Sequence, residues 1–148
     1  MVDDWPDEIV VHFDGSAQPN PGLAGGGWNI DDPLTKNELG HGWCFIGLSN
    51  TNNEAEYEGL IHALQQVKDH KYKGIVTVKG DSRLVIEQVK GNWKCKSPNL
   101  KPLLAQMMEL IKGMTVRFQH IPRDQNKRAD MLANAATVCR NRMAIFES

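Results

Sequence analysis

Residues 9–16 read IVVHFDGS, a run of β-branched and aromatic residues that ends on an acid followed by glycine and serine. The apolar part, Ile9 to Phe13, predicts a β-strand. The sequence DGS and the Pro/Asn/Gly-rich stretch behind it predict that this strand stops at Phe13 and opens into a long loop. Asp14 is therefore predicted to lie at the end of a strand, a position where functional side chains are often found.

Beyond this strand, the periodicity of apolar residues predicts four further strands and four helices. The predicted strands are 9–13, 25–30, 42–48, 75–78 and 114–120, and the predicted helices are 53–68, 82–90, 99–112 and 126–140. The resulting order, βββαβααβα, indicates an α/β fold with a five-stranded mixed sheet flanked by helices. We expect the first three strands to be antiparallel and the later two to join in parallel. No linker or repeat divides the chain, so one domain over 1–148 is expected.

Four acids stand at the ends of separate apolar segments: Asp14, Glu56, Asp81 and Asp130. On a helical wheel Glu56 lies beside the apolar stripe of its helix, so it is the acid of that segment expected to face the sheet. Thr51 and Asn52 are candidate caps of the same helix. Carboxylates that folding brings together repel one another unless a divalent cation binds between them, so the set points to metal-dependent chemistry.

Each acid also has an ordinary interpretation when it is taken alone. Asp14 could begin a turn, Asp81 could cap a helix, Glu56 could be a solvated helix acid, and Asp130 could favour the first turn of its helix. These four explanations do not account for the acids jointly, which favours the metal-site hypothesis.

Composition excludes some broad classes. The chain has 148 residues, 41% of them hydrophobic, and 17 Lys and Arg against 18 Asp and Glu, a net charge of −1. Nucleic-acid affinity would therefore depend on local basic clusters, of which there are two, although each could be an ordinary solvated face. The clusters are Lys90, Lys94, Lys96 and Lys101, and Arg117, Arg123, Lys127 and Arg128.

Three unpaired cysteines and no long apolar run lead us to expect a soluble, cytoplasmic protein in a reducing compartment, without a secretion signal and not membrane-bound.

Four motifs in this chain resemble the type 1 ribonuclease H family. They are DGSAQPNPG (14–22), TNNEAE (51–56), GDS (80–82) and HIPRDQNKRADMLA (120–133), and they span almost the whole chain in the family's order. The resemblance implies a ribonuclease H-like fold whose middle strand carries Asp14. It also implies a metal-dependent endonuclease that hydrolyses the RNA strand of RNA–DNA hybrids by a two-metal-ion mechanism and leaves 5′-phosphate and 3′-hydroxyl ends.

The resemblance assigns roles to particular positions. Asp14, Glu56, Asp81 and Asp130 fall at the family's metal-binding acids, which would hold two Mg²⁺ ions with Mn²⁺ as a substitute, and His120 falls at its catalytic histidine. A strand-end histidine before Pro122 can also be a plain loop residue. The expected substrate contacts are Gly15, Ser16, Asn20, Asn52 and Asn53 on the hybrid, and Thr51, Asn99 and Trp93 on its DNA strand. Core packing is the alternative for Trp93.

The chain departs from many family members in one respect: the interval from Lys90 to Asn99 is too short for the inserted basic handle. We therefore expect modest hybrid affinity and a log–log salt slope shallower than about −5. The partner is expected to be an RNA–DNA hybrid bound by a monomer. Activity on an RNA duplex or an RNA–DNA junction, descent from a retroelement polymerase, and a hybrid-binding module without turnover are the alternatives. The glycine run 25–27 lacks the Lys-Ser/Thr of a nucleotide-binding loop, so that reading is rejected.

Overall fold

The computed structural model describes residues 5–147, with side chains described up to residue 139, and strand β1 lies at its centre. Five strands form one sheet in the order β3-β2-β1-β4-β5. Their bounds are β1 Glu8–Gln18, β2 Gly22–Asp31, β3 Glu38–Asn50, β4 Ile75–Gly80 and β5 Thr115–His120. The β1–β2 and β2–β3 pairs are antiparallel, whereas β1–β4 and β4–β5 are parallel. The predicted mixed sheet is confirmed.

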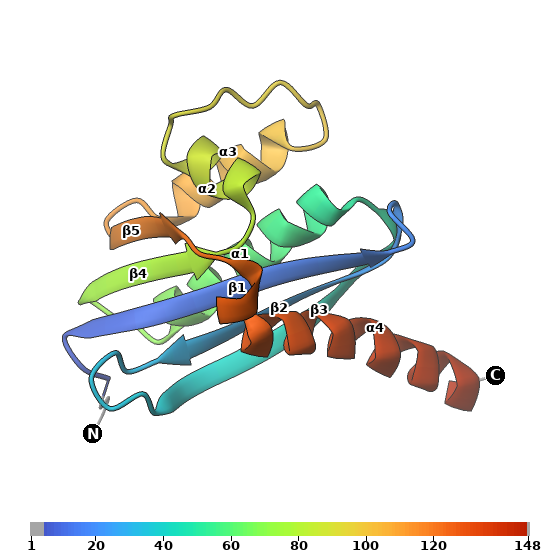
Figure 1. Ribbon diagram of the computed structural model, residues 1–148, viewed down its shortest axis with the longest axis horizontal. Coiled ribbons are helices and arrows are strands. Elements are labelled where there is room, and N and C mark those ends of the chain that lie inside the picture. The colour runs from blue at the N-terminus through green and yellow to red at the C-terminus, as the bar shows by residue number, and fades with distance from the viewer. Residues whose placement is uncertain (1–4, 148) are drawn as a thin grey trace.

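Helices cover the two faces of this sheet unequally (Figure 1). The bounds are α1 Asn52–Asp69, α2 Arg83–Val89, α3 Lys101–Leu110 and α4 Lys127–Glu147, with a short 3₁₀ turn, η1, at Arg123–Gln125. The first three helices pack together on one face, and α4 crosses the other face over β1, β2 and β3. The element order βββαβααβα is the one predicted.

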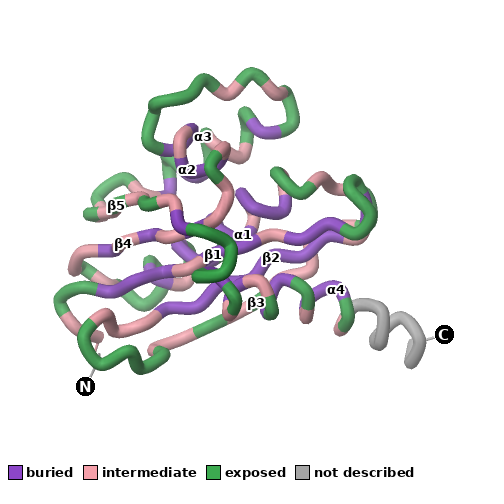
Figure 2. The backbone as a smooth tube through the Cα atoms, in the orientation of Figure 1, coloured by how far each residue is buried: buried purple, intermediate pink, exposed green. Residues whose placement is uncertain are grey.

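The main core lies between the sheet and α1, α2 and α3. Ile9, Val11 and Phe13 of β1 point into it and are fully buried, as are Leu60 and Leu64 of α1. Figure 2 shows the same pattern as a buried band that runs along the central strands and the facing side of α1. Most of β1 is buried on both faces, which suits a strand that positions a reactive group.

The predicted end of the first strand was wrong. β1 does not stop at Phe13 but continues through Asp14, Gly15 and Ser16 to Gln18, where a short turn leads into β2. Its extension pairs with the glycine-rich half of β2, in which Asp14 lies opposite Gly27 and Ser16 opposite Gly25. Cross-strand pairing thus overrides the turn preference of the sequence DGS. The predicted cap of α1 is confirmed, because Thr51 and Glu54 form a reciprocal capping box.

The glycine run 25–27 lets two helices approach β2 from opposite sides. A Cβ atom on Gly27 would lie 2.3 Å from the Ala133 nitrogen of α4, and one on Gly26 would lie 2.8 Å from the Gly59 Cα of α1. The run is therefore a packing surface, in agreement with the rejection of a nucleotide-binding loop.

Residues 90–100, between α2 and α3, contain turns, bends and irregular chain but no helix. The structure thus has no inserted handle helix at this point, as predicted from the shortness of the interval. Within residues 5–147, we find no helix that combines the length and the apolar character needed to cross a membrane.

Candidate active site

Asp14 extends from the middle of the central strand on the face that carries α4. Its side chain is buried, with only 4% exposed, and one carboxylate oxygen accepts a hydrogen bond from the Gly15 backbone nitrogen at 2.9 Å. The neighbouring residue Phe13 points into the core on the other side of the sheet, which fixes the direction of the Asp14 side chain.

Glu56 reaches Asp14 because two glycines remove the atoms that would separate β1 from α1. A Cβ atom on Gly15 would lie 2.2 Å from the Glu56 backbone nitrogen, and one on Gly59 would lie 2.5 Å from the Asp14 carbonyl oxygen. The first turns of α1 therefore lie directly on β1. Glu56 is buried at this contact, as the helical wheel predicts.

Asp81 completes a tight group of three acids. It follows the last residue of β4, the parallel neighbour of β1, so the chain leaves the sheet beside Asp14. One carboxylate oxygen from each of Asp14, Glu56 and Asp81 lies within 4.8 Å of the other two. Ser82 then caps α2, and its hydroxyl accepts a hydrogen bond from the Val85 backbone nitrogen at 3.3 Å.

Asp130 approaches the group from the opposite side, on the first turn of α4. It lies outside the set of three mutually close carboxylates, but it lines the same cavity, and its carboxyl group contributes to raising the pKa of Asp14. The start of α4 is fixed to β1 by the buried Asn126, whose side-chain nitrogen donates to the Phe13 carbonyl oxygen at 2.9 Å. Asn126 therefore positions Asp130, a role that the sequence pattern did not reveal.

The surroundings of Asp14 and Glu56 disfavour the charged form of both carboxyl groups. Burial raises the pKa of Asp14 to about 7, and the negative charge of Asp81 and the carboxyl group of Asp130 act in the same direction. Burial and the nearby Asp14 raise the pKa of Glu56 well above its usual range. The Oε2 atom of Glu56 is buried and has no hydrogen-bond partner in the described part of the chain. A buried oxygen without a donor, among hard carboxylate ligands, fits a divalent cation of the Mg²⁺ type.

The cavity around these acids has a volume of about 460 Å³ and contains further polar groups. It is lined by Gly15, Ser16, Asn52 and Asn53, whose role as hybrid contacts stays a prediction, together with Ser82, Gln18, Arg123 and Asn134. Asn134 was missed in the sequence, although it lies one helical turn after Asp130 on the same face; its Oδ1 accepts a hydrogen bond from the Ser16 hydroxyl at 2.9 Å. Arg123 was noted only as part of a basic cluster.

A second cavity of about 700 Å³ adjoins the first, because Asn52 and Asn53 line both. Thr51 and Asn99, two of the predicted DNA-strand contacts, line this second cavity together with Asn20, one of the predicted hybrid contacts. Asn52 accepts a hydrogen bond from the Ala17 nitrogen and Asn20 accepts one from the Asn52 nitrogen, so both side chains already hold the β1–β2 turn against α1. Trp93 is 47% exposed and lines neither cavity, which argues against its being a core residue.

His120 ends β5 and is not among the residues that line the acid cavity. Its Nδ1 atom lies 3.5 Å from Nη2 of Arg83, and since a guanidinium can only donate, Nδ1 is the acceptor. The remaining imidazole nitrogen then carries the proton. The catalytic role of His120 stays a prediction.

Comparison with known proteins agrees with this fold. The profile of the family described as "Reverse transcriptase-like" matches residues 12–136. Ribonuclease HI of Halobacterium salinarum is 39% identical over 132 residues, which cover 86% of this chain and 63% of that protein. The chain likewise spans 58% of the YpeP protein of Bacillus subtilis.

Two solved structures show the likeness in three dimensions. The N-terminal ribonuclease H domain of a Mycobacterium tuberculosis protein is 34% identical with a TM-score of 0.85, and the match covers 94% of this chain and 99% of that one. LC11-RNase H1, solved in complex with an RNA/DNA hybrid, is 37% identical with a TM-score of 0.84, over 89% of this chain and 98% of that one.

The five-stranded sheet and the acids gathered around Asp14 of its central strand define a protein with the ribonuclease H-like fold. Within that class, the chain belongs to the type 1 ribonuclease H family.

Proposed function

We propose that this chain is an endonuclease that hydrolyses the RNA strand of RNA–DNA hybrids and leaves 5′-phosphate and 3′-hydroxyl ends. The observation that carries the proposal is the meeting of Asp14, Glu56 and Asp81 within 4.8 Å at a cavity that Asp130 also lines. The hybrid bound to LC11-RNase H1, a structural relative, supports this choice of substrate.

Asp14, Glu56, Asp81 and Asp130 would hold two divalent cations, with Mg²⁺ as the proposed ion and Mn²⁺ as its substitute. Such ions make a water molecule nucleophilic near neutral pH and stabilise the developing charge on the leaving oxygen. The acids supply the matching hard oxygen ligands, and the repulsion that raises the pKa values of Asp14 and Glu56 is relieved when positive charge binds.

The other residues of the cavity orient the RNA. Gly15, Ser16, Asn52 and Asn53 present backbone and short polar groups at the rim, which suits contacts to 2′-hydroxyl groups in the shallow minor groove of the hybrid. His120 would donate a hydrogen bond to the departing strand from the imidazole nitrogen that does not face Arg83, and it would transfer a proton to that strand only from the doubly protonated imidazolium form.

A cleavage assay tests the proposal directly. Purified protein is incubated with Mg²⁺ and one of four labelled substrates: an RNA–DNA hybrid, an RNA duplex, a DNA duplex carrying a single ribonucleotide junction, and single-stranded RNA. We expect cleavage of the hybrid, with products carrying 5′-phosphate ends, and the duplex and junction substrates show how far the specificity extends.

Matched variants identify the site. Asp14→Asn and Asp81→Asn should each lower the rate at least about a thousandfold, because each removes a charged metal ligand, while hybrid binding is retained. Asp124→Asn changes an exposed acid outside the cavity and should leave the rate unchanged. Full activity in both Asp14→Asn and Asp81→Asn would exclude the proposed active site.

A further inference from the structure

His120 lies beside the acid cavity without lining it. The last pair of the β4–β5 ladder joins Gly80 to His120, so the histidine is the cross-strand neighbour of the residue that precedes Asp81. The backbone nitrogen of Ile121 then donates to the Gly80 carbonyl oxygen at 2.9 Å. The backbone of His120 is therefore fixed next to the acids, and the direction of its imidazole ring depends on side-chain contacts.

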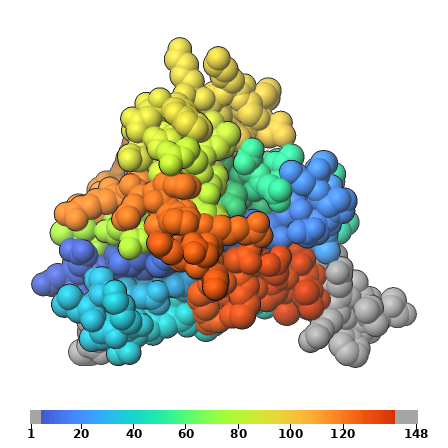
Figure 3. Space-filling model, viewed as in Figure 1, coloured from blue at the N-terminus to red at the C-terminus, as the bar shows by residue number. Residues whose placement is uncertain are grey.

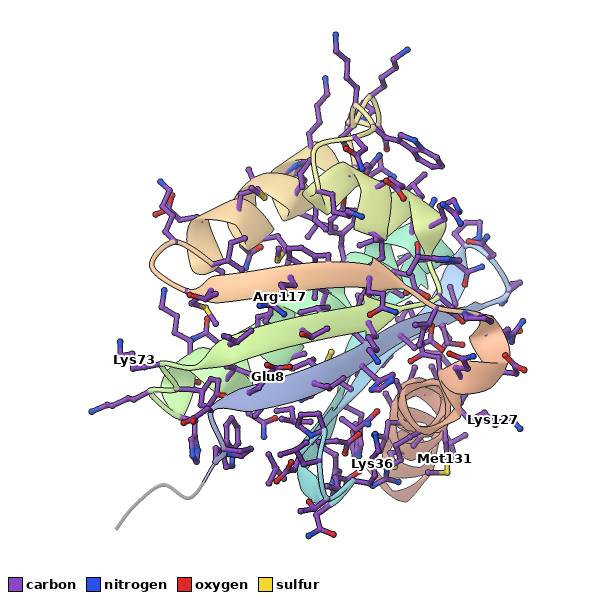
Figure 4. All side chains as sticks on the ribbon, turned by 60° about the vertical axis from the view of Figure 1, so that its left-hand side comes forward. Glu8, Lys36, Lys73, Arg117, Lys127 and Met131 are labelled. Atoms are coloured by element: carbon purple, nitrogen blue, oxygen red, sulfur yellow. The ribbon has the colours of Figure 1, made fainter. Side chains whose placement is uncertain are left out.

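The described contact of this ring comes from α2. Arg83 is the first residue of the helix, and its Nη2 atom lies 3.5 Å from Nδ1 of His120. Figure 3 shows the yellow-green α2 segment packed against the orange β5 segment, and in Figure 4, where Arg117 marks β5, α2 lies beside the end of that strand. The ring accepts this hydrogen bond only in its neutral form, because both nitrogens of an imidazolium are donors.

A second contact fixes the direction of the Arg83 guanidinium. Its Nη1 atom lies 3.5 Å from Oε2 of Glu87, one turn further along α2. The Glu87 side chain is only 14% exposed, and its other oxygen accepts a hydrogen bond from Nδ2 of Asn92 at 2.8 Å. The backbone nitrogen of Asn92 also donates to the Glu87 carbonyl oxygen, at 2.9 Å. Glu87 is thus held at two points, and the planar guanidinium connects it to His120.

The place of Arg83 is poorly explained by stability alone. The first turn of a helix carries partial positive charge on its unpaired N–H groups, so acids are favoured there and cations are not. The helix α2, all of which lies in the described part of the chain, has no acid in its first turn. The Arg83 side chain is 59% exposed, so it adds little packing. A residue that breaks a local rule without a structural gain indicates a functional role.

We propose that Arg83 is a positioning residue for His120. Its Nη2 atom donates to Nδ1, which keeps the proton of the neutral ring on Nε2 and turns this N–H away from α2. Glu87 and Asn92 in turn hold Arg83. The proposal rests on the hybrid-cleaving function above, and it adds a residue that acts through the histidine and not directly on the metal or the substrate.

A double-mutant cycle, measured with a labelled hybrid, tests whether Arg83 acts through His120. Arg83→Met removes the N–H donors but keeps most of the side-chain stem, and it should lower kcat about fivefold to tenfold with little change in KM, because the ring loses its orientation. His120→Ala should lower kcat about a hundredfold, a usual contribution of such a group. The rate of R83M/H120A should equal that of H120A within about twofold, because the two residues act as a unit.

Lys112→Ala is the matched control. It removes one positive charge and one exposed ion pair, which Lys112 forms with Glu109 at 2.8 Å, outside the two cavities. Its kcat and KM should equal those of the parent protein. Equal losses caused by R83M in the parent and in the H120A background would overturn the proposal, because Arg83 would then act on the substrate directly.

Nuclear magnetic resonance of the histidine ring nitrogens tests the contact without any cleavage, and H120A assigns the signals. His62 is an internal reference, because its Nδ1 atom lies 2.8 Å from the Glu58 carbonyl oxygen and must carry a proton there. At about pH 8, where imidazole rings are largely neutral, we expect the His120 proton on Nε2 and the His62 proton on Nδ1.

R83M should move a measurable part of the His120 population to the form protonated on Nδ1 and leave His62 unchanged. An unchanged His120 population would overturn the proposal. A parent protein that does not cleave the hybrid would instead refute the function on which the proposal rests, and the ring nitrogens of His120 would still show separately whether Arg83 holds the ring.

Discussion

The Asp14 carboxyl group is placed where its charge is least favourable, on a buried strand beside two other acids. The folded protein raises its pKa from 3.8 to about 7, chiefly through burial. An acid whose pKa is raised by folding stabilises the native state below its unfolded pKa, and this stability is lost as the pH rises towards the folded pKa.

The free energy of unfolding of the metal-free protein should therefore fall between about pH 4 and pH 7, and the contribution of Asp14 should be constant above pH 7. The Asp14→Asn variant lacks this contribution, so its stability relative to the parent protein should increase over the same interval. Urea unfolding in EDTA at several pH values measures the difference. A difference that does not change with pH would contradict the assignment.

Gly15 is required for the contact between Asp14 and Glu56. A Cβ at this position would lie 2.2 Å from the Glu56 nitrogen. The other atoms that it would meet also belong to the backbone of α1, so there is no flexible side chain that could move away. Gly15→Ala should cost about 3 kcal/mol of stability and abolish cleavage, because α1 must shift away from β1. In the control Gly40→Ala, the added Cβ would lie 2.9 Å from the end of the flexible Gln66 side chain and in ordinary contact with Ile30 at 3.8 Å, with no backbone atom near it, so denaturant unfolding should show a much smaller change.

Single residues differ in how far the sequence predicts them. The four acids were predicted because each lies in a motif, and the structure places all four at one cavity. The apolar spacing of α1 predicted correctly that Glu56 is turned towards the sheet. Asn126 and Asn134 were missed because an asparagine is ordinary near a helix start, and their partners, Phe13 and Ser16, lie more than a hundred residues away in the chain. Such long-range polar contacts have no periodic signal in the sequence.

At the level of elements, α4 depends on the surface that β2 offers to it. Ala129, Ala133 and Ala136 are buried against the strand, and a Cβ on Gly27 would lie 2.3 Å from the Ala133 nitrogen. Small residues on both sides bring the two backbones together, which brings Asp130 to the cavity edge.

Gly27→Ala should therefore loosen α4 while the rest of the sheet stays folded. We expect faster amide hydrogen exchange in α4, unchanged protection in β4 and β5, and cleavage reduced by at least about tenfold, because small displacements of catalytic groups are costly. Gly26→Ala offers a comparison on the same strand, since its Cβ would meet Gly59 of α1 instead. Equal loss of protection in α1 and α4 for both variants would show that the two helices do not depend on separate glycines.

The length of β1 shows why element boundaries are less predictable than element types. The sequence DGSAQPNPG has the composition of a turn, and local preference places the end of the strand at Phe13. The pairing of residues 14–18 with residues 23–27 keeps them in the sheet. That pairing depends on the flat, glycine-rich partner strand, which local propensity does not take into account.

For the whole molecule, topology brings the distant acids together. Asp14 and Asp81 are 67 positions apart in the chain, but β1 and β4 are parallel neighbours, and each acid lies two residues beyond the pair His12–Lys79, so the two acids lie side by side. The order of elements was predictable because each has a clear period. The distances within the acid cluster were not, because they depend on the close contacts at Gly15 and Gly59.

An acid cluster of this kind couples metal binding to the stability of the entire fold. The carboxylates are close together only in the native state, so a cation bound there stabilises the folded protein by about 2.7 kcal/mol at a hundred times its Kd. For a chain of this length, this corresponds to a rise in Tm of about 8 °C. We expect Tm to increase with Mg²⁺ concentration in the parent protein and to stay constant in D14N/D81N. Because the two substitutions also remove the repulsion among the carboxylates, the metal-free variant should have a higher Tm than the metal-free parent protein. Differential scanning calorimetry of both proteins, with matched ionic strength to remove general salt effects, measures the two curves. An identical rise in both would mean that the ion acts somewhere other than at these carboxylates.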